Sequence, residues 1–419
     1  MKRILTLIVC VILALAVTTV SVSAEEIQSA MSSLKVRIAS ESVTGDLFTT
    51  YETAETLKED IPASADSLNV NAKSAVLMEV STGKILFEQN KDDKLAPASI
   101  TKIMSLLLIV EALEAGKITK EETVTASATA ASMGGSQIWL EEGETMTVHE
   151  MLKATAVASA NDACVALAEH VAGSVEEFVS MMNARASELG MKNTVFVNCT
   201  GLDAEGHLTT AYDVAVMSRE LIKHEMIKEY TQIWIDYLRN GETQLVNTNK
   251  LARFYDGTTG LKTGTTSQAG YCLSATAEKN GMELVAVVMS GSTSNERFNG
   301  AKKMLNYGFA NWCVTVPQID TSLIKPVKVN GGKEDCVETV TESIKPVILK
   351  KGEEKGIACE VKLCEEINAP VKKGDMLGSV TIKLGDSVIG NYKITATQSV
   401  DKLTLGTVLI RLIKSLVGL

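Results

Sequence analysis

Residues 97–102 read Pro97-Ala98-Ser99-Ile100-Thr101-Lys102, and the strongly apolar run Ile-Met-Ser-Leu-Leu-Leu follows. Apolar residues recur at spacings of three and four as far as Glu114, and Gly116 comes next, so we expect a buried helix over residues 100–114. Residues three apart share a helical face, which lets the Lys102 amine reach the Ser99 hydroxyl. Burial lowers the pKa of a lysine, so this pair is a candidate nucleophile and general base.

The Ser-x-x-Lys spacing has little weight alone. Four other serines also precede a lysine by three residues, namely Ser32, Ser81, Ser322 and Ser399. What distinguishes Ser99 is that its lysine opens an apolar helix, where it can be desolvated. Histidine is the more usual partner of a catalytic serine, but only His207 among the four histidines is a candidate for that role, and no Gly-x-Ser-x-Gly elbow places a nucleophile near it.

A second motif is Ser159-Ala160-Asn161. A serine and an asparagine two apart do not share a face of a regular helix, but they can point into one cleft from a loop between helices. The Ser159 hydroxyl could relay a proton, and the Asn161 amide could hold a peptide carbonyl or orient the lysine. Taken alone, the tripeptide reads better as an ordinary loop turn or helix cap.

The third motif is Lys262-Thr263-Gly264-Thr265, just before a predicted strand at residues 271–277. A strand that edges a cleft can offer a cation and a hydroxyl to a substrate carboxylate. Gly264 would let a substrate backbone lie close, and the N–H of Thr265 could donate to a developing oxyanion. The alternative is a strand end with a turn, although Lys-Thr-Gly occurs only once in the chain.

The N-terminus predicts export. Lys2 and Arg3 precede the apolar run 4–20, and Val22-Ser23-Ala24 forms a small-residue cleavage site, so residues 1–24 read as a signal peptide. A retained membrane anchor is the alternative. The formal net charge of −10 argues against a nucleic-acid partner, which would require clustered Lys and Arg.

The number and spacing of the cysteines predict no cross-linked structure. Seven cysteines follow the leader, and an odd number without a C-x-x-C pattern indicates neither a disulfide scaffold nor a zinc site. Cys164 and Cys272 lie in apolar surroundings and are expected to be buried thiols. Cys359 and Cys364 are close enough in sequence for a local bridge. No metal or organic cofactor is indicated.

The length of 419 residues predicts at least two domains. Residues 25–70 form a polar lead-in, and residues 71–314 mix strands with helices. The mixed region contains an expected hairpin at 73–90, helical patterns at 148–171, 175–189, 210–223 and 294–309, and strands at 271–277 and 284–290. In residues 315–400 short β-branched runs alternate with Gly and Lys turns, which predicts a small all-β domain.

Residues 401–419 form the last segment. One helical face carries Leu405, Val408, Leu409, Leu412, Leu416 and Leu419, and both charged residues of this helix, Arg411 and Lys414, are basic. This pattern favours an interfacial helix that anchors the protein to a membrane surface. Docking of the helix on the β domain is the alternative.

Motifs of the Ser-x-x-Lys, Ser-x-Asn and Lys-Thr-Gly type, in this order, are the pattern of penicillin-binding proteins and serine β-lactamases. With the further blocks Gly201-Leu202-Asp203 and Asn247-Thr248-Asn249-Lys250-Leu251, the sequence resembles the low-molecular-mass penicillin-binding proteins, specifically the D-alanyl-D-alanine carboxypeptidase family, from about residue 71 to the end. The resemblance implies an α+β, β-lactamase/transpeptidase-like fold: a five-stranded antiparallel sheet flanked by helices, with a helical subdomain, then the β domain and the amphipathic helix.

The resemblance also implies a reaction on peptidoglycan stem pentapeptides outside the cytoplasmic membrane. Ser99 would attack the carbonyl of the penultimate D-alanine and expel the terminal one. Lys102 would accept the serine proton, Ser159 would relay it to the leaving amine, and Asn161 would position the substrate. Water would then release the acyl-enzyme, whereas β-lactams would trap Ser99 as a slowly hydrolysed ester.

For substrate binding, the resemblance implies that Lys262 and Thr263 engage the terminal carboxylate. The amides of Ser99 and Thr265 would form the oxyanion hole. Relatives often carry His at the position of Thr265, a departure that bears on substrate preference or deacylation. Arg297 is a candidate for an additional arginine near the substrate carboxylate.

Two other functions compete with a carboxypeptidase. A serine β-lactamase of class A would need a deacylating Glu in a loop between the second and third motifs, where no segment clearly supplies one and Glu188 lies in a helical pattern. A penicillin-sensing or wall-binding protein without turnover is the second. The sequence does not show whether the wall is vegetative or spore, which diamino acid its peptide carries, or the oligomeric state.

Overall fold

The computed structural model of the chain describes residues 64–409. The chain divides into two compact units, residues 1–59 and 60–419, and every described residue belongs to the second. The predicted signal peptide, most of the predicted polar lead-in and residues 410–419 of the predicted tail helix lie outside the described residues. A short 3₁₀ turn, η1 (Ala65–Ser67), precedes the first strand.

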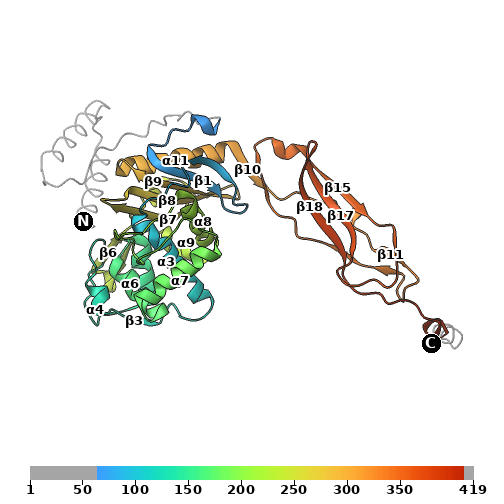
Figure 1. Cartoon of the computed structure of the whole chain (residues 1–419), viewed down its shortest axis with the longest axis horizontal. Helices are drawn as coiled ribbons and strands as arrows, with labels where there is room; N and C mark the ends of the chain where they lie inside the picture. The colour runs from blue at the N-terminus through green and yellow to red at the C-terminus, as the bar shows by residue number, and fades with distance from the viewer. Residues whose placement is uncertain (1–63, 410–419) are drawn as a thin grey trace, which may run out of the picture. The chain divides into compact units, whose positions relative to one another are not determined.

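A five-stranded antiparallel sheet forms the centre of the region between residues 71 and 314 (Figure 1). Its strand order is β2-β1-β9-β8-β7, which leaves β7 at an edge. The strands are β1 (Ala72–Glu79), β2 (Ile85–Gln89), β7 (Thr258–Thr266), β8 (Gly270–Lys279) and β9 (Met282–Gly291). The predicted hairpin and both predicted strands are confirmed.

The central strand β9 is buried on both faces. Val285, Val287 and Met289 belong to one hydrophobic core, whereas Leu284 and Val288 belong to the other. Successive side chains of a strand point to opposite faces, so a strand covered on both sides needs an unbroken apolar run. This explains why residues 284–289 contain no polar residue.

Helices cover both faces of the sheet (Figure 1). On one face lies α11 (Ser294–Asn311), which packs through Phe298, Met304 and Leu305. On the other face lies α8 (Ala211–Ile222), and the helical region continues beyond it. That region comprises α3 (Lys102–Glu114), α4 (Ala128–Ala131), α5 (Val148–Val157), α6 (Asn161–Ala172), α7 (Val175–Glu188), α9 (Glu225–Thr231), and the hairpins β3 (Thr123–Thr125) with β4 (Thr145–Thr147) and β5 (Ile235–Leu238) with β6 (Thr243–Val246). The short helix α10 (Leu251–Phe254) instead buries Leu251 in the core that contains α11.

Two predicted helices differ from the structure. The segment at 100–114 begins with a 3₁₀ turn, η2 (Ala98–Thr101), and becomes α-helical only at Lys102. The pattern at 148–171 is two helices, α5 and α6, separated where Ser159 adopts a left-handed backbone with φ of 65°. The apolar period continues across the break because both helices bury residues in the same core.

The C-terminal region contains β strands and two short 3₁₀ turns up to residue 404, which confirms the predicted all-β character. Its main sheet has the order β13-β18-β17-β15. The strands are β10 (Trp312–Thr315), β11 (Val327–Asn330), β12 (Cys336–Val337), β13 (Thr339–Thr341), β14 (Val347–Lys350), β15 (Ile357–Leu363), β16 (Glu366–Asn368), β17 (Met376–Leu384) and β18 (Ser387–Ala396).

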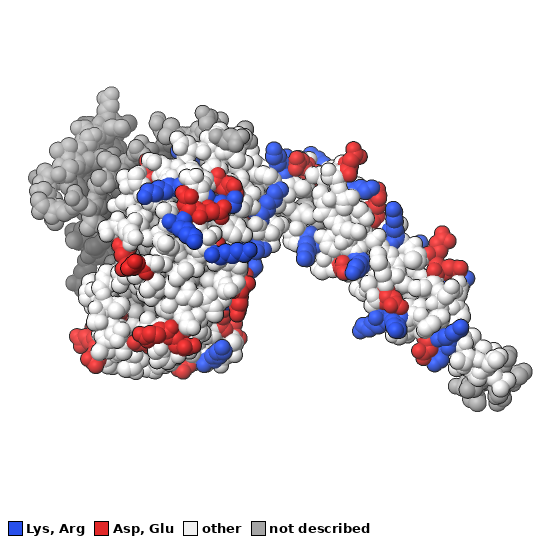
Figure 2. All heavy atoms as spheres, in the orientation of Figure 1, with Lys and Arg blue, Asp and Glu red and all other residues white. Residues whose placement is uncertain are grey.

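Of the predicted tail segment 401–419, residues 401–409 are described: residues 401–404 are not helical and Lys402 forms a β-bridge with Gly332, whereas residues 405–409 are helical. Between residues 64 and 409 no helix has the length and hydropathy of a membrane span. Cys164 and Cys272 are buried free thiols, as predicted, and the local bridge considered for Cys359 and Cys364 is not formed. On the face drawn in Figure 2, acidic and basic side chains are interspersed over the surface.

Candidate active site

The candidate nucleophile and base lie where η2 passes into α3. Lys102 is fully buried, and its Nζ donates to Ser99 Oγ at 3.1 Å, to Asn161 Oδ1 at 2.5 Å and to the Thr200 carbonyl at 2.8 Å. Burial lowers the pKa of Lys102 from 10.5 to about 8. The amine is therefore held against the serine hydroxyl by two further acceptors, and burial makes it easier to deprotonate than a solvated lysine.

The second motif occupies the connection between α5 and α6. Ser159 is buried in a backbone conformation that is uncommon for a residue other than glycine, and its Oγ has no hydrogen-bond partner within residues 64–409. Asn161 is fixed by two bonds: its Nδ2 donates to the Gly134 carbonyl at 2.6 Å, and its backbone N–H donates to the Ser136 carbonyl at 2.7 Å. These bonds direct Asn161 Oδ1 to Lys102.

The third motif lies on the edge strand β7. Lys262 is fully buried, and its Nζ donates to the Thr263 carbonyl at 3.2 Å. Burial, and after it the positive charges of Lys102 and Arg297, hold the pKa of Lys262 well below its usual value. The Thr263 hydroxyl donates to the Thr248 hydroxyl at 2.7 Å, which ties β7 to the predicted Asn-Thr-Asn-Lys-Leu block.

Two glycines allow the segments to meet. A Cβ on Gly264 would lie 2.9 Å from the backbone nitrogen of Ser99, so only glycine lets β7 approach the nucleophile this closely. Gly201 has a φ of 87°, and a Cβ there would lie 1.8 Å from the Ala98 carbonyl oxygen. Both glycines belong to sequence blocks on which the family resemblance rests.

Arg297 lies on α11 and contacts the end of the third motif. Its Nη1 donates to the Gly264 carbonyl at 3.0 Å, to Thr265 Oγ1 at 2.9 Å and to the Cys272 carbonyl at 3.2 Å. Its Nε is buried and has no hydrogen-bond partner in the described part of the chain. The arginine therefore braces β7 through Thr265 and the neighbouring backbone.

The structure thus brings the predicted residues to one place, some in direct contact with the nucleophile and others around it. Ser99, Lys102 and Asn161 form a single hydrogen-bonded group, and Gly264 packs against the Ser99 backbone. Ser159 lies two residues before the start of α6, and Lys262 is close enough to Lys102 to respond to its charge. Thr263 and Thr265 lie on β7, and Arg297 donates to the hydroxyl of Thr265.

Sequence reasoning missed two contributors. The Thr200 carbonyl holds Lys102, but any residue type can supply a backbone acceptor, so the sequence carries no signal for it. Asp162 is fully buried and accepts hydrogen bonds from the N–H groups of Ile138 and Leu140, which fastens that loop to α6. Its position directly after the Ser159-Ala160-Asn161 motif was the available clue.

His207, the histidine that we considered as a base, has a structural role. It is buried, its Nδ1 accepts from the Val197 N–H at 2.9 Å, and its Nε2 lies 2.8 Å from Thr101 Oγ1. Burial lowers its pKa to about 4, so it is neutral at pH 7. It supports η2 through Thr101 and makes no hydrogen bond to Ser99.

Comparisons with known proteins agree with this geometry. Residues 60–293 match the peptidase S11 family of D-alanyl-D-alanine carboxypeptidases, and residues 317–402 match the C-terminal domain of penicillin-binding protein 5. D-alanyl-D-alanine carboxypeptidase DacF of Bacillus subtilis is 44% identical over 370 residues, which cover 87% of this chain and 95% of that protein.

Two solved structures are also similar. Penicillin-binding protein 5 of Haemophilus influenzae matches with a TM-score of 0.70 at 30% identity, over 80% of this chain and 98% of that one. Penicillin-binding protein D2 of Listeria monocytogenes, in its ampicillin-bound form, matches with a TM-score of 0.53 at 31% identity, over 58% of this chain and 99% of that one. The chain belongs to the D-alanyl-D-alanine carboxypeptidase family of serine peptidases, within the low-molecular-mass penicillin-binding proteins.

Proposed function

We propose that this carboxypeptidase removes the terminal D-alanine of peptidoglycan stem pentapeptides through an acyl-enzyme on Ser99. The observation that carries the proposal is the 3.1 Å hydrogen bond between Ser99 Oγ and the buried Nζ of Lys102. Neutral Lys102 takes the hydroxyl proton as Oγ attacks the carbonyl carbon of the penultimate D-alanine. The bond to the terminal D-alanine then breaks, and an ester to Ser99 remains.

The leaving amine needs a proton, and the Ser159 hydroxyl is suited to pass it on. Buried hydroxyls normally have a partner, so the unpaired Oγ of Ser159 supports a role completed only when substrate is present. Asn161 Oδ1 and Ser99 Oγ both accept a hydrogen bond from Lys102 Nζ. The side chain of Asn161 also positions the peptide. Asn161 is held by its bonds to the Gly134 and Ser136 carbonyls, which keeps its side chain aligned with Lys102 before substrate arrives.

The negative charge that develops on the carbonyl oxygen is stabilised by the backbone N–H groups of Ser99 and Thr265. The close approach of Gly264 to Ser99 supports this pairing, because it brings β7 to the nucleophile. Lys262 and Thr263 bind the terminal carboxylate. Arg297 acts mainly through Thr265 and the β7 backbone, since its Nη1 already donates to three acceptors there.

Water hydrolyses the ester and frees Ser99. A β-lactam presents a strained amide and a carboxylate to the same groups, so we expect it to acylate Ser99 and to hydrolyse slowly. The ampicillin-bound Listeria relative supports this expectation. Glu188, the glutamate considered for a β-lactamase, ends α7 and forms an ion pair with Arg185 at 3.2 Å, with its side chain largely exposed.

We further propose that the enzyme works outside the cytoplasmic membrane, peripherally anchored there. The basic and apolar leader at residues 1–24 supports export, and the apolar face and basic residues of segment 401–419 support binding to a membrane surface. The likeness to wall-acting carboxypeptidases along most of the chain fits this location.

The central test is mass spectrometry of the benzylpenicillin adduct, with the modified peptide mapped. We expect the label on Ser99, and its presence on any other residue contradicts the assignment. Wild-type protein should release D-alanine from diacetyl-Lys-D-Ala-D-Ala, and Ser99→Ala should not. Rapid repeated turnover of a chromogenic cephalosporin would favour a β-lactamase, and a penicillin adduct without release of D-alanine would favour a sensor.

A further inference from the structure

Two cysteines lie in contact with each other beside the candidate base. Cys164 lies on α6, three residues after Asn161, and Cys199 directly precedes Thr200. Both are fully buried free thiols, and the Cys164 Sγ donates to the Cys199 carbonyl at 3.4 Å. The two thiols are also close enough to hydrogen-bond to each other. No step of the proposed reaction uses either of them.

The pair joins the two segments that hold Lys102. The lysine amine donates to Asn161 Oδ1 in the first turn of α6, and to the carbonyl of Thr200, the residue after Cys199. Cys164 belongs to the first of these segments and Cys199 to the second. A covalent link between the two thiols would therefore act on both acceptors of the base.

The surroundings of Cys164 favour its thiolate, which is the form of a cysteine that reacts with oxidants. The hydrogen bond from the Cys199 thiol and the positive charge of Lys102 lower the pKa of Cys164 below its ordinary value, even against the effect of burial. The same contact between the thiols, together with burial, raises the pKa of Cys199. One cysteine is thus the better nucleophile, and the other is its protonated neighbour.

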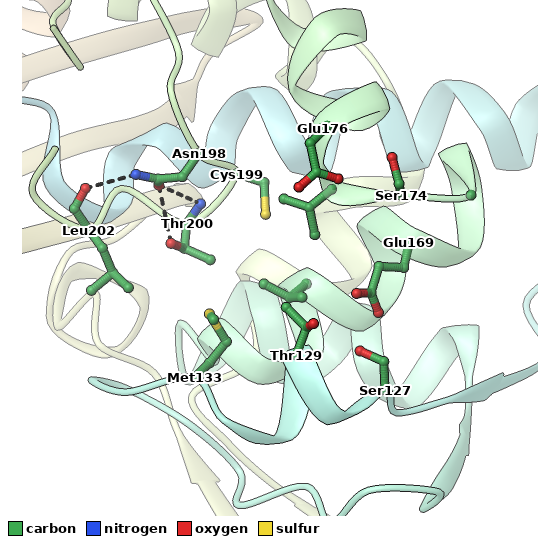
Figure 3. Close-up of a pocket in the computed structure, with 13 residues that line it drawn as sticks. Ser127, Thr129, Met133, Glu169, Ser174, Glu176, Asn198, Cys199, Thr200 and Leu202 are labelled. Carbon is green, nitrogen blue, oxygen red and sulfur yellow. Dashed lines mark hydrogen bonds between the residues drawn. The ribbon is translucent and has the colours of Figure 1, made fainter. Parts of the chain in front are cut away.

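A pocket leads from solvent to this pair. Cys199 lines a cavity of about 530 Å³ together with Thr200 of the same turn (Figure 3). Thr129 and Glu176 also line it and are exposed, so the cavity is open to solvent. Cys199 itself has no exposed surface, which favours a small oxidant such as hydrogen peroxide over a bulky disulfide. From Cys199 the oxidant has only to reach the thiol in contact with it.

We propose that Cys164 and Cys199 form a redox-sensitive site, where hydrogen peroxide produces a disulfide that switches off the reaction of Ser99. The proposal rests on the proposed function, because the reaction that is switched off is acylation of Ser99 with Lys102 as base. The Cys164 thiolate attacks one peroxide oxygen and the O–O bond breaks. The hydroxide that leaves takes up the proton that Cys164 released, and a sulfenic acid remains.

The second step closes the disulfide. The Cys199 sulfur attacks the sulfenic sulfur of Cys164, so that the S–S bond forms and the S–O bond breaks. The leaving hydroxide takes the Cys199 thiol proton and departs as water. In total, two thiols are oxidised to one disulfide, and one hydrogen peroxide is reduced to two water molecules.

The disulfide changes the setting of the base. A covalent bond holds two sulfurs closer together than a hydrogen bond does, so it draws the Cys199 backbone towards α6. The carbonyl of Thr200, the next residue, shifts with that backbone and no longer holds Lys102 in its place. Because a displacement of roughly 1 Å can slow a reaction about a hundredfold, we expect acylation by benzylpenicillin to slow about tenfold or more.

The test treats residues 25–419 with excess hydrogen peroxide and compares the acylation rate constant of each protein with that of its own untreated sample. Wild type should slow about tenfold or more, and dithiothreitol should restore the rate, because it reduces a disulfide. Cys164→Ala should keep its untreated rate within about twofold, because the attacking thiolate is gone. Cys272→Ala is the matched control: it removes another buried thiol, leaves the pair intact and should respond as wild type does.

Peptide mapping of the treated wild type, with free thiols alkylated before digestion, gives a readout that does not depend on activity. We expect a peptide in which Cys164 and Cys199 are joined by a disulfide. Absence of this linkage, an unchanged acylation rate in linked protein, or equal inactivation of Cys164→Ala and wild type overturns the proposal. Failure of the proposed function has a different result, because untreated wild type would then not be acylated on Ser99, whereas the linkage would still be found by mapping.

Discussion

Lys102 determines the pH at which this site can react. Only the neutral amine can accept the Ser99 proton, and burial lowers the pKa of Lys102 to about 8. The protonated fraction therefore grows as the pH falls below 8, and the reactive fraction drops about tenfold for each further pH unit. We expect the second-order rate constant for acylation by benzylpenicillin to rise about tenfold between pH 6 and pH 7.

The control for this prediction is Lys102→Arg. A guanidinium group stays protonated throughout this range, so the variant should not be acylated measurably at any pH from 6 to 8. A wild-type rate constant that stays flat between pH 6 and pH 7 would show that Lys102 is not the base, or that it is already neutral at pH 6.

The pairing of Ser99 with Lys102 was predictable from the sequence even though the expected helix began too early. The prediction used the shared face of residues three apart in an α-helix. In a 3₁₀ turn, residues three apart eclipse each other still more closely, so the contact persists across η2 (Ala98–Thr101). The Thr200 carbonyl, by contrast, was not predictable, because a backbone oxygen leaves no trace in residue type.

Among the secondary-structure elements, α6 and the loop at residues 134–140 act together. The carboxylate of Asp162 accepts from the N–H groups of Ile138 at 3.0 Å and Leu140 at 3.1 Å, and all three residues are buried. Asp162→Ala leaves both N–H groups unsatisfied, at a cost of about 1–3 kcal/mol each. We expect the free energy of unfolding, measured with urea, to fall by about 2–4 kcal/mol.

The same change should slow acylation by benzylpenicillin about tenfold, because the loop also holds Asn161 through Gly134 and Ser136. Asp162→Asn is the matched control: it keeps one acceptor oxygen and should lose less stability than the alanine variant. An Asp162→Ala protein as stable as wild type would mean that the loop finds other acceptors.

The approach of β7 to η2 depends on Gly264. A Cβ at this position would lie 2.9 Å from Ser99 N and 3.0 Å from Ile100 N, and neither backbone atom can move aside without shifting the nucleophile. Gly264→Ala should therefore reduce the acylation rate constant by about a hundredfold, as expected for a displacement of roughly 1 Å between reacting groups.

Gly134→Ala serves as the control for Gly264→Ala. No atom lies within 4 Å of a Cβ at Gly134, and the substitution keeps the carbonyl that binds Asn161. Its acylation rate should stay within about twofold of wild type. If Gly264→Ala is also acylated within twofold of wild type, the close packing of β7 on Ser99 does not matter for the reaction.

Helices and strands were predictable where buried residues recur at a regular spacing. They were less predictable where residues of the active site interrupt that spacing. Strand β9 has two apolar faces and was expected from its unbroken run. Strand β7 gives a weak strand signal, because its buried positions include Lys262, Thr263 and Gly264, which serve the site. The helical pattern at 148–171 did not show the break at Ser159, although the Ser159-Ala160-Asn161 motif suggested a loop there, because apolar periodicity reports a shared core rather than a continuous backbone.

At the level of the whole molecule, the predicted membrane anchor can be separated from the β domain by a cut after Thr404. Among residues 64–409, the last contacts of that domain with the following chain come just before it: the Leu403 N–H donates to the Gly331 carbonyl, and Asp401 forms an ion pair with Lys333 at 2.8 Å. A chain of residues 25–404 therefore keeps these contacts and loses the apolar face with Arg411 and Lys414.

We expect residues 25–419 to sediment with vesicles that contain anionic lipid, and residues 25–404 to stay in the supernatant. Both proteins start at Glu25, so the apolar leader cannot contribute. The basic residues are attracted to the anionic headgroups while the leucines enter the interface, so binding should weaken in high salt and on neutral vesicles. The rates at which the two proteins release D-alanine from a soluble peptide should agree within about twofold, because the cut is remote from Ser99 in sequence and spares the β domain.

A second variant, Leu409→Glu/Leu416→Glu, keeps the length and the basic residues and should also fail to bind. If it binds as wild type does, charge alone attaches the tail, and if residues 25–404 still sediment, the anchor lies elsewhere in the chain.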